Sequence, residues 1–146
     1  MACFDELVKD YRDCQIVVTL TDFGHRCGYV RVPDRLFDIF MDKGLCAEEA
    51  LEYAFDVHGG ITFSTYVQSA DSRFPQFGYW IGFDCAHAED GKDLDAVAKH
   101  FGKERAEEIR KYYTYPNTHT WTTEEVEKEC ERLADQILEI TPDYEI

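Results

Sequence analysis

This chain lacks several patterns, and each absence narrows what the protein can be. The six cysteines include no C-x-x-C pair, so we expect free thiols or metal ligands rather than a disulfide framework. No apolar run approaches the roughly 18 residues of a membrane span. Basic residues are scarce: 15 Lys and Arg against 30 Asp and Glu give a formal net charge of -15. That balance argues against direct binding to a nucleic-acid backbone.

Familiar catalytic motifs are also missing. The chain contains no G-x-x-x-x-G-K-[ST], G-x-G-x-x-G, H-E-x-x-H or G-x-S-x-G pattern, and no zinc-deaminase pattern. Nucleotide-binding folds and hydrolases with a nucleophile elbow are therefore disfavoured. The first residues lack the basic and apolar regions of a secretory signal, so we expect a cytoplasmic protein with no membrane partner.

The composition predicts one folded domain over residues 1–146. The chain is 45% hydrophobic and 14% aromatic, which is typical of a globular protein with a real core. The predicted fold class is α+β: a small antiparallel β-sheet covered on one face by helices, with a long C-terminal amphipathic helix.

The periodicity of apolar residues predicts the individual elements. Strands are expected at 15–21, 29–32, 61–67 and 78–85. Helices are expected up to about Cys14, at 47–55, 94–101 and 103–113, and through a C-terminal helix that begins with a capping box at Thr122 and Glu125. Residues 36–41 fit either type, and loops are expected at 71–76 and 115–119. The first helix rests on Leu7, Val8 and Tyr11, which fall on one side of a helix.

Two short segments carry the side chains suited to chemistry. An aromatic run from Tyr79 ends in Asp84, Cys85 and His87, followed by Glu89 and Asp90. Upstream lies the segment 56–64, which contains a histidine and two glycines: His58, Gly59 and Gly60. Strand ends present side chains to solvent, so the two segments together suggest a site.

One interpretation of these residues is a metal site. In an extended segment Cys85 and His87 point the same way, and thiolate and imidazole are preferred zinc ligands. With His58 they form the candidate metal set. Further ligands are available elsewhere in the chain: Cys27 and His25 from the hairpin turn, and Glu89 or Asp90. The cofactor expected for such a set is zinc.

A second interpretation is nucleophilic catalysis. Cys85 would attack as the thiolate, His58 would act as its base, and Asp84 would orient the histidine. The amides of Gly59 and Gly60 would supply an oxyanion hole. A third interpretation is purely structural, with buried cysteines as packing and the two glycines as a bend that needs positive φ.

Four sequence blocks resemble those of a family of small, uncharacterised proteins found in phages, prophages and gut bacteria. They lie at residues 28–30 (G-Y-V), 57–64 (V-H-G-G-I-T-F-S), 80–87 (W-I-G-F-D-C-A-H) and 129–136 (E-C-E-R-L-A-D-Q). The resemblance implies an accessory protein of mobile elements inside a host bacterium. It implies no activity. Glu89 departs from the glycine expected at that position.

Two classes of function follow. The first is a small enzyme or metal-binding protein built on His58, Asp84, Cys85 and His87. The second is an acidic anti-defence protein that binds the basic surface of a host nuclease, using carboxylates where phosphates would sit. Its binding acids would be the run in the last helix: Glu124, Glu125, Glu127 and Glu129.

Overall fold

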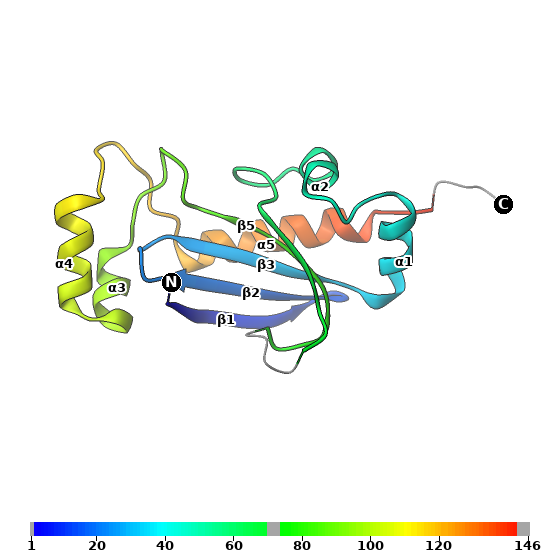
Figure 1. The fold of residues 1–146 in the computed structure, drawn as a ribbon, viewed down its shortest axis with the longest axis horizontal. Coiled ribbons are helices and arrows are strands. Elements are labelled where there is room, and N and C mark those ends of the chain that lie inside the picture. Colours follow the sequence, from blue (N-terminus) through cyan, green and yellow to red (C-terminus); the bar gives the residue numbers. More distant parts are fainter. Residues whose placement is uncertain (1, 70–73, 143–146) are drawn as a thin grey trace.

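The computed structural model describes residues 2–69 and 74–142. These residues form a five-stranded antiparallel sheet with helices, which is the α+β class expected from the sequence (Figure 1). The strands are β1 (Cys3–Tyr11), β2 (Cys14–Thr21), β3 (Arg26–Val32), β4 (Phe63–Val67) and β5 (Gly78–Asp84). The helices are α1 (Asp34–Asp42), α2 (Glu48–Ala54), α3 (Leu94–Phe101), α4 (Lys103–Tyr112) and α5 (Thr123–Leu138).

The spatial order of the strands is β1-β2-β3-β5-β4, so β5 pairs with β3 and with β4. Strands β2 and β5 are largely apolar, and one face of the sheet packs against α1, α2 and α5. Val30 and Ile81 from the sheet meet Phe40 of α1, Leu51 of α2 and Leu133 of α5, all fully or almost fully buried. This layer is the main hydrophobic core.

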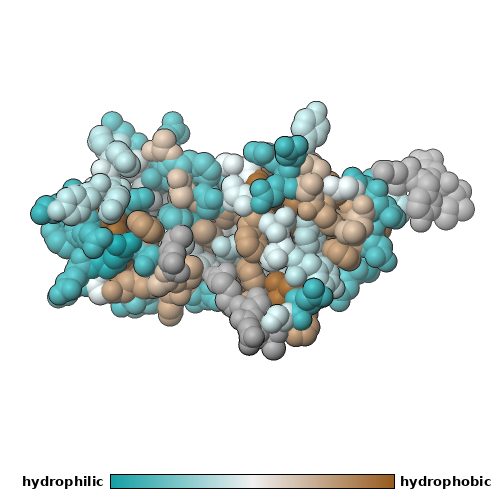
Figure 2. Space-filling model, viewed as in Figure 1, coloured by the Kyte–Doolittle hydropathy of each residue, from teal (hydrophilic) through white to brown (hydrophobic). Residues whose placement is uncertain are grey.

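The opposite face of the sheet carries a smaller cluster. Val17, Val67 and Trp80 are buried there, and Tyr29 and Phe63 pack against them. In Figure 2 hydrophobic residues are scattered among polar ones across the view, while hydrophilic residues cover most of the end formed by α3 and α4. Tyr29 and Phe63 of this cluster also line a hollow on the second face.

The N-terminal element is a strand, and the expected helix up to Cys14 is wrong. β1 pairs with β2 along its length, with an irregularity between Asp5 and Leu7. Leu7 and Tyr11 pack against the core, and Lys9 between them pairs with Glu127 of α5. The residues of β1 that face α5 therefore alternate along the chain, as expected for a strand. The middle one of these three residues is a lysine, Lys9.

The other expected elements are found with shifts of up to three residues at their ends, the largest at β3, which begins at Arg26 rather than Tyr29. The ambiguous segment 36–41 lies in α1, and the capping box of α5 forms with Thr122 and Glu125 donating and accepting reciprocally. Of the expected loop at 71–76, residues 71–73 lie outside the described residues. Among the described helices, none has the length and apolar character needed to cross a membrane.

A buried ion-pair cluster links β1 and β3 to the segments that precede α3 and α5. Arg26 of β3 is 4% exposed and bonds both carboxylate oxygens of Glu6 at 2.5 and 2.9 Å. The same guanidinium pairs with Asp93, the N-cap of α3, at 2.8 Å and donates to the carbonyl of Trp121 at 2.9 Å. A buried charge needs such partners. The cluster fixes the segments that lead into α3 and α5.

Candidate metal centre

His58 lies in the turn between α2 and β4, and this turn is tied to α5. The amide of His58 donates to Oε2 of Glu129 at 2.7 Å. Two residues earlier, Asp56 exchanges hydrogen bonds with Gln136: its amide donates at 2.8 Å and its carbonyl accepts at 2.9 Å. The backbone that carries the imidazole is therefore held at several points.

His87 and Asp90 lie in the turn that follows β5. The amide of Asp90 donates to the carbonyl of His87 at 2.9 Å, which closes the turn. In return, the amide of His87 donates to Oδ2 of Asp90 at 3.0 Å. The turn folds the Asp90 side chain back under the His87 ring, and Asp90 and His119 form an isolated β-bridge beyond it.

The two turns bring both imidazoles onto one carboxylate. Nε2 of His58 lies 2.9 and 2.8 Å from the two oxygens of Asp90. Nδ1 of His87 lies 3.1 Å from Oδ2 of the same residue. The two imidazole rings are perpendicular, with centroids 5.2 Å apart. Asp90 is therefore the shared partner of two histidines from distant parts of the chain.

Burial differs sharply within this group. The side chain of Asp90 is 3% exposed, whereas those of His58 and His87 are 25% and 39% exposed. Burial alone raises the pKa of Asp90, but the hydrogen bonds from His58 and from the amide and ring of His87 outweigh it and hold that pKa below its ordinary value. The carboxylate is thus charged at neutral pH and faces two rings that solvent can reach.

Gly59 is the residue that lets the two turns approach. Its backbone has a φ of +70°, and a Cβ added there would lie 2.0 Å from Cε1 of His87. Any side chain at this position would collide with the imidazole. Gly60 also has positive φ, and its amide donates to the carbonyl of Val57 at 3.0 Å. The bend with positive φ expected at the two glycines is confirmed. The Gly60 amide donates its hydrogen bond inside this bend.

His58, His87 and Asp90 can together hold one metal ion. One ligand atom from each can be chosen so that all three lie within 4.8 Å of one another. Two ligands of a tetrahedral zinc ion lie about 3.3 Å apart, which follows from bond lengths near 2.0–2.1 Å. Small movements of the rings would bring the three atoms to that spacing. A metal would then replace the imidazole protons that now face the carboxylate.

Cys85 lies apart from this group. It is 1% exposed within the main core, and its amide donates to the carbonyl of Arg26 at 2.9 Å. Burial raises the pKa of the Cys85 thiol, and the nearby Asp90 carboxylate adds to the rise. The nucleophilic role of Cys85 stays a prediction, and its burial weighs against it.

Asp84, the last residue of β5, borders the group that could hold a metal ion. Its Oδ1 lies 3.9 Å from Nε2 of His87 and accepts from the amide of Ala86 at 3.1 Å. Its Oδ2 accepts from the hydroxyl of Thr62 at 3.0 Å. The sequence predicts that Asp84 orients His58 as the base of Cys85, but the carboxylate that bonds His58 is that of Asp90, and Asp84 lies beside His87 instead.

The remaining candidate ligands lie elsewhere. His25 and Cys27 line a hollow on the second face of the sheet together with Asp84. Glu89 is exposed, and its carbonyl accepts from the amide of His119 at 2.9 Å. Among the described residues, these three are not part of the group that can hold a metal.

Two contacts of the site were not predicted from the sequence. The ring of Trp121 lies over His58, with centroids 4.3 Å apart and planes tilted by 34°. Glu129 accepts from the His58 amide and from Arg132, and these bonds lower its pKa against the effect of burial, which raises it. Neither Trp121 nor Glu129 belongs to a sequence pattern that would indicate its contact with His58.

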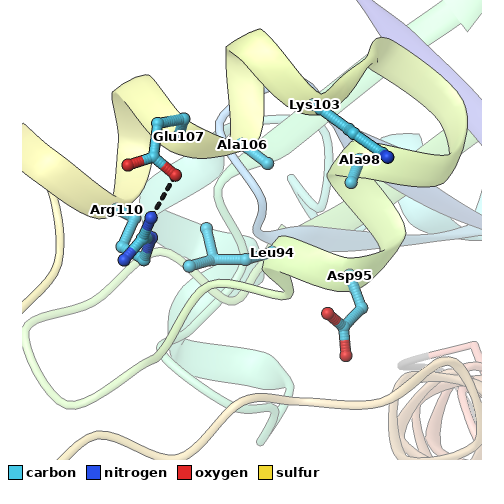
Figure 3. A pocket seen from close by; sticks show the side chains of 7 residues that line it. All are labelled: Leu94, Asp95, Ala98, Lys103, Ala106, Glu107 and Arg110. Atoms are coloured by element: carbon cyan, nitrogen blue, oxygen red, sulfur yellow. Dashed lines mark hydrogen bonds and ion pairs between the residues drawn. The ribbon is translucent and has the colours of Figure 1, made fainter.

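A second hollow, of about 360 Å³, lies between α3 and α4 (Figure 3). Leu94, Ala98 and Ala106 line it with apolar groups, and Glu107 pairs with Arg110 one turn further along α4. The carboxylate and the guanidinium satisfy each other there. None of the site residues predicted from the sequence lines this hollow.

Comparison of the chain with protein-family models, curated proteins and solved structures gave no match. The structure itself shows an α+β fold in which two histidines and one buried aspartate lie together at the end of the sheet. The resemblance of its sequence blocks to phage proteins stays a prediction.

Residues of the four blocks contact one another in the structure. A Cβ added at Gly28 would lie 2.5 Å from Sγ of Cys130 and 2.6 Å from Cζ of Phe83, so β3 and β5 meet α5 with no room for a side chain there. Glu129 binds the His58 backbone. The blocks thus belong to one assembly of strand, turn and helix around the candidate site.

Proposed function

We propose that this protein binds a divalent transition metal ion, zinc in the first place, through His58, His87 and Asp90, and that the ion activates water for hydrolysis. The observation that carries the proposal is the convergence of two partly exposed imidazoles on one buried carboxylate. Two histidines and a carboxylate are a ligand set that zinc uses in hydrolytic sites.

The number of ligands supports a catalytic role over a structural one. Structural zinc sites are closed by four protein ligands, whereas catalytic sites use three and leave a position for water. Here the described residues supply three. Both imidazoles reach solvent, so water and a substrate have access to an ion held between them. The same ligand set also suits iron(II), which makes the choice of metal part of the test.

Surrounding contacts would hold the ligands in place. The carboxylate of Asp84 lies near the ring nitrogen of His87 that faces away from Asp90, and the Trp121 ring packs against His58. Metal-bound histidines commonly donate their second N–H to a carboxylate, which fixes the ring. Asp84, whose Oδ1 lies 3.9 Å from Nε2 of His87, would have to move closer to accept that hydrogen bond.

Titration of chelator-treated protein with cobalt(II) and zinc tests the proposal. Cobalt bound by two imidazoles and a carboxylate gives visible absorption bands, and zinc should displace them with one ion per chain. His58→Ala, His87→Ala and Asp90→Asn should each weaken binding by at least about tenfold. His119→Ala is the matched control, because His119 also bonds a carboxylate, that of Glu125 at 2.8 Å, outside the group.

Hydrolysis is tested on the same proteins with 4-nitrophenyl acetate as a general activated ester. The zinc-loaded protein should hydrolyse it faster than the chelated protein, and His87→Ala should remove the difference. Binding of the metal without any gain in hydrolysis would leave a metal-binding protein and refute the catalytic half of the proposal. Absence of binding would refute both halves.

The nuclease-inhibitor hypothesis has less support in the structure. Of the four acids in α5 on which it rests, three have partners within the protein: Glu125 bonds His119, Glu127 pairs with Lys9, and Glu129 pairs with Arg132. Carboxylates that are already paired offer little to a basic partner. The hypothesis stays a prediction.

A further inference from the structure

A hollow of about 250 Å³ lies on the second face of the sheet, beside the candidate metal centre. It is formed where the β2–β3 turn, the first residues of β1 and the start of β4 meet the end of β5. The lining residues are Cys3, Thr21, His25, Cys27, Tyr29, Thr62, Phe63, Phe83 and Asp84. The volume is slightly below the range of about 300–1,000 Å³ for small-molecule sites, so a small ligand fits it.

The walls of the hollow combine aromatic rings with hydroxyl groups. The rings of Tyr29 and Phe63 meet edge to face, with centroids 5.1 Å apart, and both are half-buried. Thr21 and Thr62 add hydroxyls, and each is bonded to a neighbour: Thr21 to His25, and Thr62 to Asp84. Aromatic faces attract cations through their quadrupole.

The charges of the hollow have one sign. Asp84 is the carboxylate in the lining, and no lysine or arginine belongs to it among the residues that the structure describes. Burial, with a contribution from Lys92 outside the lining, lowers the pKa of His25 below its ordinary value, so this imidazole is neutral at pH 7. The hollow is therefore electrostatically suited to a cation, and the net charge of -15 makes the whole molecule attractive to cations.

We propose that this hollow binds a small organic ammonium ion that carries an aromatic or aliphatic group. The ammonium would pair with the Asp84 carboxylate, and the apolar group would lie against Tyr29 and Phe63. A carboxylate and aromatic rings together are the chemistry that recognises such cations. The site goes beyond the metal centre, and its occupancy does not depend on a bound ion.

The position of Asp84 would bring the ligand next to the metal centre. Its carboxylate lines the hollow and also lies 3.9 Å from His87. If both sites are filled, an amine bound at Asp84 lies beside an ion held by His87. Binding of the amine and binding of the metal can nevertheless be measured separately, so each proposal can fail alone.

An NMR titration of ¹⁵N-labelled, chelator-treated protein tests the amine site. The probes are 2-phenylethylamine, 2-phenylethanol and 3-phenylpropionate, which share a ring and differ in charge. We expect saturable shifts at the amides of Thr21, Thr62 and Asp84, and at least about tenfold tighter binding of the amine than of the alcohol. Equal binding of the three probes, no saturation, or shifts elsewhere would overturn the proposal.

Three variants complete the test. Asp84→Asn should reduce amine binding to the level of the alcohol, and unchanged binding would refute the role of its charge. Cys3→Lys adds a positive charge at an exposed lining residue and should also weaken the amine by about tenfold, even if Asp84→Asn fails to fold. The control Tyr53→Lys adds the same charge at a position 97% exposed outside the hollow and should change nothing. His87→Ala should lose the metal and keep the amine.

Discussion

Gly59 offers the sharpest test of how the site is built. The change Gly59→Ala imposes two costs that the structure separates. The first is conformational: a non-glycine residue at a φ of +70° costs about 1–2 kcal/mol. The second is steric, because the new Cβ would lie 2.0 Å from Cε1 and 2.3 Å from Nε2 of His87. Carbon atoms prefer separations of about 3.5–4.0 Å, so the ring must move by about 1.5 Å.

The movement has a predictable energetic effect. It breaks the bond of about 3.1 Å between Nδ1 of His87 and Asp90, a bond to a charged group worth about 1.5–3 kcal/mol. The free energy of unfolding of the metal-free Gly59→Ala protein should therefore fall by about 2.5–5 kcal/mol. The same displacement should weaken zinc binding about 10–100-fold, because one ligand leaves its place.

The chain contains a matched control for this change. Gly44 has a φ of +73°, close to that of Gly59, but nothing lies within 4 Å of a Cβ added there. Gly44→Ala should cost only the conformational part and leave zinc affinity unchanged. Urea unfolding gives the stabilities, and competition with a chromophoric chelator gives the affinities. Equal losses in both variants, or normal zinc binding in Gly59→Ala, would refute the described packing of the two turns.

Other parts of the structure give three more predictions. Arg26→Met should lower the free energy of unfolding, measured in urea, by about 3–5 kcal/mol, because it leaves the acids of its buried cluster unpaired. Adding Glu6→Gln should recover part of this loss. If the losses of the two single variants simply add in the double variant, the pairing is contradicted. Iodoacetamide should alkylate exposed Cys3 in the native protein and spare Cys85, because burial shields the Cys85 thiol and raises its pKa. Peptide mass spectrometry measures the labelling. Equal labelling of the two cysteines would refute the burial of Cys85. Folding lowers the pKa of His25 from 6.5, so the unfolded chain binds a proton at His25 more readily than the folded protein does. The free energy of unfolding should therefore fall as the pH drops below 6.5. His25→Gln should make this fall less steep, and an unchanged dependence of stability on pH would contradict the burial of His25.

Most of the fold could be predicted from the sequence because its apolar patterns are strong. The largely apolar strands β2 and β5 and the capped helix α5 can be recognised directly from their sequences. β1 could not be recognised, because one of its inward-facing residues is Lys9, which is neutralised by Glu127 and Glu131 on α5. A lysine at an inward position hides the alternation of a strand until its partner helix is known.

The candidate site was predicted in part for a similar reason. The sequence brought His58 and His87 together and included Asp90 among further ligands, but it favoured Cys85 as the thiol beside them. That choice assumed an extended chain from Phe83 through His87. The strand ends at Asp84, and the following turn directs His87 toward Asp90 while Cys85 enters the core. Where a strand stops depends on its neighbours, which spacing alone does not reveal.

Metal content is the most direct test of the central claim. Untagged protein purified without chelator should contain close to one zinc or iron ion per chain by elemental mass spectrometry. His58→Ala, His87→Ala and Asp90→Asn should lose it, while Cys85→Ala should retain it, because Cys85 lies outside the group. Metal that is absent from the unaltered protein, or lost only in Cys85→Ala, would contradict the account.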